Sequence, residues 1–249
     1  MHLGLRSHFR CNRYTDLRLV AGEKTYNVHR IVLCSQAKWF ERLCFRHKDL
    51  DKISINMNPK TKDEEKMIAT MVHYFYNSDY KDTAGVVGLV GASKNEPFPE
   101  ELGYWNQRIF NLRIWGVGHQ FDIPDLRELA IEKFCTVKGV TKYGLYKEEG
   151  SDETKVLVEV DRYFKDACEM VYGMGSMCPF AFKRGLINDF AREFNELRAD
   201  TSKLMSVTEN RVNGFECYRK FASDNPEFRH DLSLLVIKGE VHIDYNTVV

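Results

Sequence analysis

The stretch from Tyr14 to Phe45 constrains the fold of this 249-residue chain more than any other part of the sequence. It contains two short segments, 17–21 and 24–28, in which apolar and polar residues alternate, and a turn with Gly22 lies between them. Alternation at every second residue places one set of side chains on the buried face of a strand. The sequence therefore predicts a β-hairpin near the start of the chain.

A helix is expected directly after this hairpin. Phe40, Leu43 and Cys44 have the spacing of one helical face, and Ser35 has the side chain of a good N-cap for that helix. His29 lies where the second strand ends. We interpret it as a structural residue that joins strand to helix by a hydrogen bond, because no His or Cys lies at metal-binding spacing from it.

Further elements follow in order along the chain. Alternation predicts a third strand at 52–57, and Thr61 with Glu64 forms a capping box that begins a long helix. Glycine and proline interrupt the pattern at 81–103, which predicts a loop insertion. Helical periodicity resumes near Tyr104, and Pro124 is expected to start another helix.

The C-terminal part has a different character. A change of composition at 138–157 predicts a linker, and the residues after it show helical periodicity. We expect helices over 160–172, 186–197, 215–221 and from 226 onward.

Composition excludes several classes of protein. Lys plus Arg equals Asp plus Glu, at 36 residues each, so a broad phosphate-binding surface is not expected. The seven cysteines are scattered without a Cys-x-x-Cys pair, which indicates a reducing compartment and no disulfide framework. No apolar run is long enough to cross a membrane. We expect a cytoplasmic or nuclear protein.

The ordered set of segments resembles the BTB domain, also called the POZ domain. The resemblance rests on Asp16-Leu17-Arg18-Leu19 in the first strand, and on His29, Leu33, Ser35 and Phe40, with Ala37 where a second Ser is usual. It continues in the helix that ends at Tyr74–Tyr80, with Ser78 in place of a glycine, and in the segment 121–130. The helical tail is similar to the lone BTB proteins of fungi.

This resemblance implies an α+β fold, with a small sheet capped by helical hairpins and followed by an α-helical C-terminal extension. It also implies an adaptor that pairs with itself, with other BTB proteins or with a cullin-type ubiquitin ligase scaffold. A homodimer or hetero-oligomer is expected. The candidate interface residues are Phe9, Tyr14, Trp39, Phe40 and Met57. The expected organisation is an N-terminal arm (1–13), a BTB/POZ-like domain (14–137), the linker (138–157) and the helical extension (158–249).

Alternatives remain open at this point. Cullin recruitment in the family goes with a hydrophobic-x-Glu motif after the third strand, but the matching segment here, Met57–Lys60, contains no acid. An enzyme of unrecognised type is a second alternative, although we identify no catalytic residue, metal site or cofactor loop. A nucleic-acid binder using Arg6, Arg10 and Arg13 is a third, and we interpret these arginines as a solvated arm.

Overall fold

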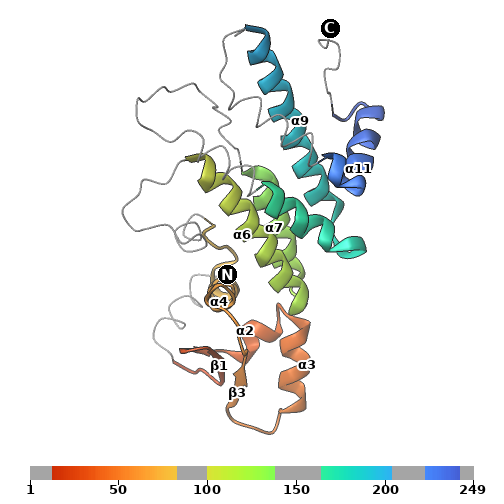
Figure 1. Ribbon diagram of the computed structural model, residues 1–249. Helices are drawn as coiled ribbons and strands as arrows, with labels where there is room; N and C mark the ends of the chain where they lie inside the picture. The colour runs from red at the N-terminus through yellow and green to blue at the C-terminus, as the bar shows by residue number, and fades with distance from the viewer. Residues whose placement is uncertain (1–12, 83–99, 138–163, 204–221, 242–249) are drawn as a thin grey trace, which may run out of the picture. The chain divides into compact units, whose positions relative to one another are not determined.

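The computed structural model describes residues 13–82, 100–137, 164–203 and 222–241, and the following account concerns these residues (Figure 1). Two units can be distinguished, and each is described by itself. The first comprises residues 1–94 and 110–133, and the second comprises residues 95–109 and 134–249. The elements are β1 (Leu17–Ala21), β2 (Lys24–Val28), α2 (Arg30–Cys34), α3 (Lys38–Arg46), β3 (Ile53–Asn56), α4 (Lys62–Asn77), α6 (Glu100–Gln120), α7 (Pro124–Thr136), the 3₁₀ turn η2 (Gly175–Met177), α9 (Phe180–Lys203) and α11 (Pro226–Ile237), and residues 164–173 are also helical.

The first unit contains a mixed three-stranded sheet in the order β2-β1-β3. β1 is antiparallel to β2, with Leu17 opposite Val28, and parallel to β3, with Leu17 opposite Ile53. These inward side chains are buried while their neighbours in β1 and β3 alternate outward. The predicted hairpin and third strand are therefore confirmed, as is the α+β fold class.

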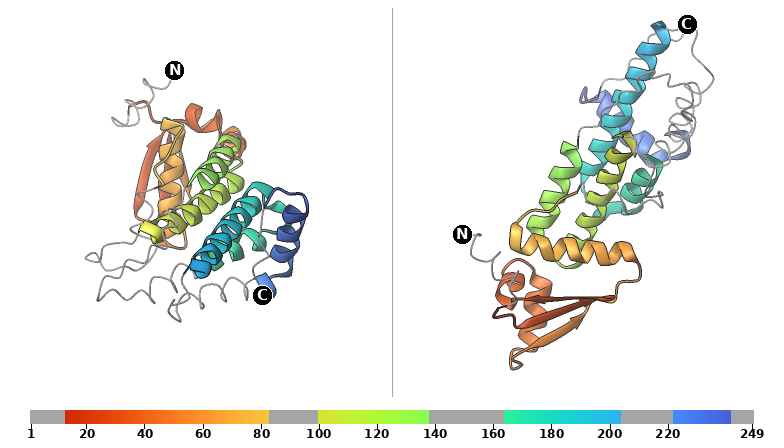
Figure 2. Two further views of the ribbon diagram at one scale, coloured as in Figure 1. Left: turned by 90° about the horizontal axis from the view of Figure 1, so that it is seen from above. Right: turned by 90° about the vertical axis from the view of Figure 1, so that its left-hand side faces the viewer.

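Aromatic residues from α3, from α4 and from the turn after α6 form the core beside this sheet. The ring of Phe40 in α3 lies 5.8 Å from that of Phe75 in α4 and 5.8 Å from that of Phe121, which follows α6. Trp39 contacts Phe121 edge to face at 5.1 Å. Aromatic pairs of this kind stabilise a core beyond the contribution of buried area. Figure 2 shows α6 and α7 side by side as a helical hairpin.

The long helix α4 begins and ends at residues that the sequence singled out. The Thr61 hydroxyl accepts a hydrogen bond from the backbone N–H of Glu64 at 3.1 Å, so the predicted N-cap is confirmed. The Glu64 carboxylate, however, accepts from the backbone N–H of Lys60 and not from that of Thr61. Ser78 ends the helix in the left-handed conformation, with φ at 52°.

The prediction for Ser35 is wrong. The chain forms two short helices here. Ser35 is the C-cap of α2, and Ala37 is the N-cap of α3. The Ser35 hydroxyl donates backward to the carbonyl of Val32 at 3.1 Å. This bond satisfies a terminal carbonyl of α2, so the side chain is not available to cap α3. Helix α6 also begins at Glu100, within the stretch expected to be a loop.

The second unit is helical, as expected of the C-terminal part. Phe164, Phe190 and Phe228 bring three helices together, with Phe228 lying 6.2 Å and 5.2 Å from the other two rings. Helices α9 and α11 lie side by side in Figure 1. The buried side chains of Arg108 and Asp189 form an ion pair at 2.7 Å. The predicted linker and the helix expected at 215–221 lie outside the described residues.

Candidate interaction surfaces

Four large apolar side chains of the first unit are exposed. Tyr14 is 83% exposed, Ile31 74%, Phe45 73% and Leu50 52%. They come from the segment before β1, from α2, from α3 and from the turn after α3. We call these four residues the α2–α3 patch. Exposed large apolar residues mark interaction sites when they lie together, so these four residues are the first candidate surface.

Arg30 ties three of the contributing segments to one another. Its backbone N–H donates to the Asp16 carboxylate at 2.8 Å, and its side chain donates to the carbonyl of Asp16 at 3.2 Å. The same guanidinium also donates to the carbonyl of Leu50. The segment before β1, the first turn of α2 and the turn after α3 are therefore held together, and Tyr14, Ile31 and Leu50 are presented from this common base.

His29 fixes the same region from the inside. Its Nε2 lies 2.7 Å from the carbonyl oxygen of Arg13, which can only accept, so Nε2 carries the proton. Its Nδ1 lies 2.9 Å from the Tyr76 hydroxyl, and its backbone N–H donates to the same hydroxyl at 3.0 Å. In the neutral imidazole, the Tyr76 hydroxyl then donates to Nδ1. The interpretation of His29 as a structural link from strand to helix is confirmed.

Burial makes the Tyr76 hydroxyl a structural group. Burial raises the pKa of Tyr76 to about 12, although the hydrogen bond from the His29 backbone opposes the shift. The hydroxyl therefore keeps its proton at neutral pH and remains able to donate to His29.

The five predicted interface residues have different fates. Tyr14 belongs to the α2–α3 patch, whereas Trp39 and Met57 are half-buried. Phe40 is fully buried in the aromatic core, so its prediction as an exposed contact residue is wrong. The rings of Trp39 and Phe40 both pack on Phe121 in the folded chain. Phe9 lies outside the described residues.

The sequence reasoning did not identify Ile31, Phe45 or Leu50 as surface residues. The sequence alone does not distinguish Ile31 from its neighbours, because α2 buries Val32 and Leu33 and leaves Ile31 exposed only through the packing of the fold. Phe45 is similar, since α3 buries Phe40 and Cys44 and Phe45 follows Cys44 directly.

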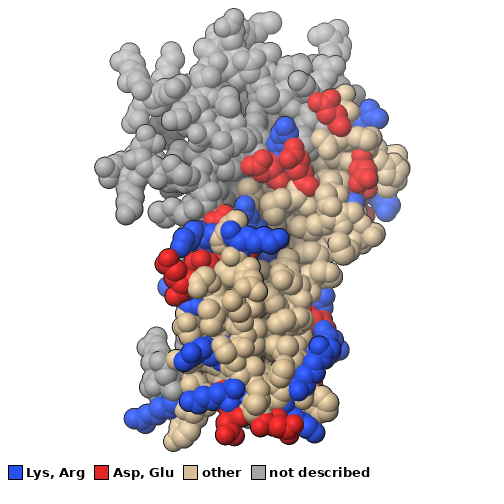
Figure 3. Space-filling model, turned by 60° about the horizontal axis from the view of Figure 1, so that its bottom comes forward, with Lys and Arg blue, Asp and Glu red and all other residues tan. Residues whose placement is uncertain are grey.

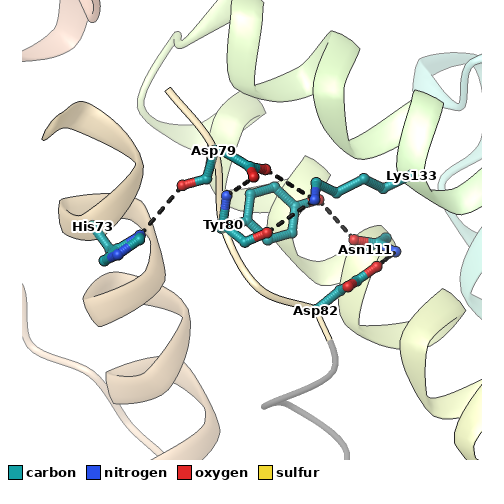
Figure 4. Close-up of polar contacts among 6 residues, drawn as sticks. All are labelled: His73, Asp79, Tyr80, Asp82, Asn111 and Lys133. Carbon is teal, nitrogen blue, oxygen red and sulfur yellow. Dashed lines mark hydrogen bonds and ion pairs between the residues drawn. The ribbon is translucent and has the colours of Figure 1, made fainter. Parts of the chain in front are cut away.

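A polar network holds the chain after α4 (Figure 4). The buried Tyr80 donates its hydroxyl proton to Asn111 at 2.7 Å, and Lys133 donates to the carbonyl of Tyr80 and to Asp79, each at 2.9 Å. Burial acts to raise the pKa of the Asp79 carboxyl. The hydrogen bonds from Lys133 and from the Tyr80 N–H, together with the Lys133 charge, outweigh burial, so the pKa lies below its ordinary value. The network joins the end of α4 to α6 and α7 and has a structural role.

Two thiols, one in each unit, are poorly suited to nucleophilic chemistry. Burial raises the pKa of Cys34 to about 12, with a contribution from its hydrogen bond to Cys44, and burial raises the pKa of Cys178 to about 11. A thiol with such a pKa is protonated at neutral pH, and the thiolate is the nucleophile.

Neither a metal site nor a membrane span is found in the part of the chain that the structure describes. The described residues contain no group of three or more His, Cys, Asp or Glu side chains that could hold a metal ion. None of the described helices combines the length and the apolar character needed to cross a bilayer.

On the face drawn in Figure 3, lysine and arginine side chains lie among aspartate and glutamate side chains. Neither sign of charge forms a broad area of its own there. A nucleic-acid surface would need a concentration of positive charge, so this face offers no support for one.

Comparison with known proteins gives one matching family model and similar solved structures. Residues 5–89 match the model of the BTB/POZ domain family. Among solved structures, the chain is similar to the BTB domain of zebrafish PATZ1, with 13% sequence identity and a TM-score of 0.33 over 52% of this chain and 83% of that chain. No curated protein sequence matches. The family match confirms the resemblance seen in the sequence, whereas the similarity to fungal members stays a prediction.

Proposed function

We propose that this chain is a protein-interaction adaptor that associates with a second copy of itself through the BTB/POZ domain at residues 5–89. BTB/POZ domains are protein-interaction modules, and the family match supports this general role for the chain. The observation that carries the finer proposal is the α2–α3 patch, where Ile31 and Phe45 are each about three-quarters exposed. Removing such side chains from water contributes about 1.5–3 kcal/mol for each one that is fully covered.

The surroundings of the patch have the character of an interface rim. The Lys48 ammonium lies 5.7 Å from the centre of the Phe45 ring, and the Arg30 side chain is anchored beside Ile31. Apolar anchors bordered by charged groups are typical of protein interfaces. A two-fold contact would use the same patch on both chains, so each apolar residue would contribute twice.

The oligomeric state of the intact chain tests this proposal. Sedimentation equilibrium should be measured from about 1 to about 100 µM, a range suited to a weak dimer. We expect the mass to approach twice the chain mass of 29.1 kDa. The variants Ile31→Asp and Phe45→Asp place a charge inside the contact and should reduce the association constant by at least about tenfold.

Met177→Asp is the matched control, because Met177 is also exposed, at 62%, but belongs to the second unit. It should leave the association constant unchanged. A strictly monomeric wild-type chain at the highest concentration would refute self-association. Equal weakening by Met177→Asp would show that the α2–α3 patch is not the contact.

We do not extend the proposal to a cullin scaffold. The segment Met57–Lys60 lacks the acid of the family motif, and the nearby Glu64 carboxylate is already bound to the Lys60 backbone at 2.6 Å. Recovery of a cullin with the purified chain would reverse this judgement. An enzyme function likewise has no supporting observation in the described residues.

A further inference from the structure

Tyr14, a member of the α2–α3 patch, has a backbone conformation that is unusual for its residue type. Its φ is 59°, in the left-handed region, where the Cβ atom of an L-residue comes too close to the following carbonyl oxygen. Glycine, asparagine and aspartate adopt this conformation most readily, whereas a bulky residue there is an outlier. Residues with such backbone strain cluster at functional sites, which makes Tyr14 a candidate for a role beyond folding.

The other non-glycine residues with a positive φ in the described chain all have short polar side chains. They are Asn58, Ser78 and Asp122. Short polar side chains can form local hydrogen bonds that reduce the cost of the left-handed conformation. The hydroxyl of Tyr14 lies at the far end of a rigid ring and cannot make such a bond to its own backbone. The strain at Tyr14 is therefore not relieved by local side-chain chemistry.

Hydrogen bonds on both sides of Tyr14 hold its backbone in this conformation. On the N-terminal side, the carbonyl of Arg13 accepts from the ring of the buried His29 at 2.7 Å. On the C-terminal side, the backbone N–H of Asp16 donates to the carbonyl of Val28 at 3.2 Å. A strained residue persists only where the surrounding structure over-determines its conformation, and these bonds fix the chain on either side.

Burial of the Tyr14 side chain does not offset the backbone cost. Its exposed fraction of 83% is the highest among the exposed large hydrophobic residues of the described chain. An asparagine or glycine at this position would fold with less strain. Tyrosine is, however, enriched among the few residues that carry most of the binding energy of protein interfaces. A tyrosine here is explained if a partner covers its ring.

We infer that Tyr14 is the anchor of the self-association contact, and that its strained backbone presents the ring for coverage by the second copy. This inference rests on the proposed self-association and adds which residue of the α2–α3 patch dominates it. Because the hydrogen bonds on both sides fix the segment before contact, little conformational freedom is lost on association. The free chain accepts lower stability at Tyr14, and the dimer gains the covered ring.

The test separates the ring of Tyr14 from its backbone conformation. Tyr14→Asn and Tyr14→Gly remove the ring, so the association constant from sedimentation equilibrium should fall by at least about tenfold. At about 0.1 µM, where a weak dimer is dissociated, Tyr14→Asn should raise the thermal midpoint by about 2–4 °C because the strain is relieved. Tyr14→Phe keeps the ring and the strain. It should associate within about threefold of the wild type and keep the wild-type midpoint.

Asn58→Gly is the matched control, because Asn58 is also exposed and has a φ of 45° in the first unit but is not part of the α2–α3 patch. It should leave the association constant unchanged. Unchanged association of Tyr14→Asn, with weakened association of Ile31→Asp, would overturn this inference and leave self-association standing. A lower midpoint for Tyr14→Asn would also overturn it, since the ring would then stabilise the fold. A strictly monomeric wild type would overturn both proposals.

Discussion

Replacing Tyr76 by Phe should destabilise the first unit by about 2–4 kcal/mol. The substitution keeps the ring, which contacts His29 edge to face at 5.9 Å, and removes only the hydroxyl. Two contacts to His29 are lost, from its backbone N–H at 3.0 Å and from its Nδ1 at 2.9 Å. Both residues are buried, at 1% and 8% exposure, so water does not replace the bonds without rearrangement. Each buried group left without a partner costs about 1–3 kcal/mol, and partial relaxation reduces the sum.

Urea denaturation of the intact chain, followed by tryptophan fluorescence, measures this change because Trp39 packs on Phe121 in the same unit. Tyr74→Phe is the matched control. Tyr74 is on the same helix and 4% exposed, and its hydroxyl makes no hydrogen bond to the rest of the described chain. We expect the control to change the free energy of unfolding by less than about 1 kcal/mol. Equal losses in the two variants would refute the argument that His29 and Tyr76 act as a pair.

Three further predictions concern other parts of the chain. Ser78→Gly should stabilise the first unit by about 0.5–1 kcal/mol, because Ser78 has φ at 52°, where a Cβ is unfavourable, and an unchanged thermal midpoint would contradict this. Arg108→Met should cost about 1–3 kcal/mol in urea denaturation, because the buried Asp189 loses its 2.7 Å ion pair and keeps the one to Arg192 at 2.9 Å, and an unchanged free energy of unfolding would contradict this. The folded state holds the pKa of Asp79 below its ordinary value of 3.8, so this carboxylate stabilises the fold above that pH and its contribution is lost as the pH falls below it. Lys133→Met should flatten the stability profile in this acidic window, and an unaltered profile would exclude Lys133 as the source.

Local signals predicted much of the fold. Apolar residues recur at every second position in 17–21 and 53–56, and the strands there alternate between buried and more exposed positions. The start of α4 at Thr61 and of α7 at Pro124 followed from side chains that act on backbone groups a few residues away. Such signals are readable because the interaction lies within one turn of chain.

The candidate surfaces were much less predictable. Phe40 and Phe45 lie on one helix and have the same side chain, yet one is fully buried and the other is 73% exposed. The choice depends on Phe75 and Phe121, which arrive from other helices and cover only one of the two rings.

The amino-acid sequence by itself determined the hairpin and the order of the helices after it, because these depend on periodicity and on caps. The tertiary structure alone decided which apolar residues remain available to a partner. Exposure depends on which distant segments arrive at a given face, and no residue carries that information in its own neighbourhood in the chain.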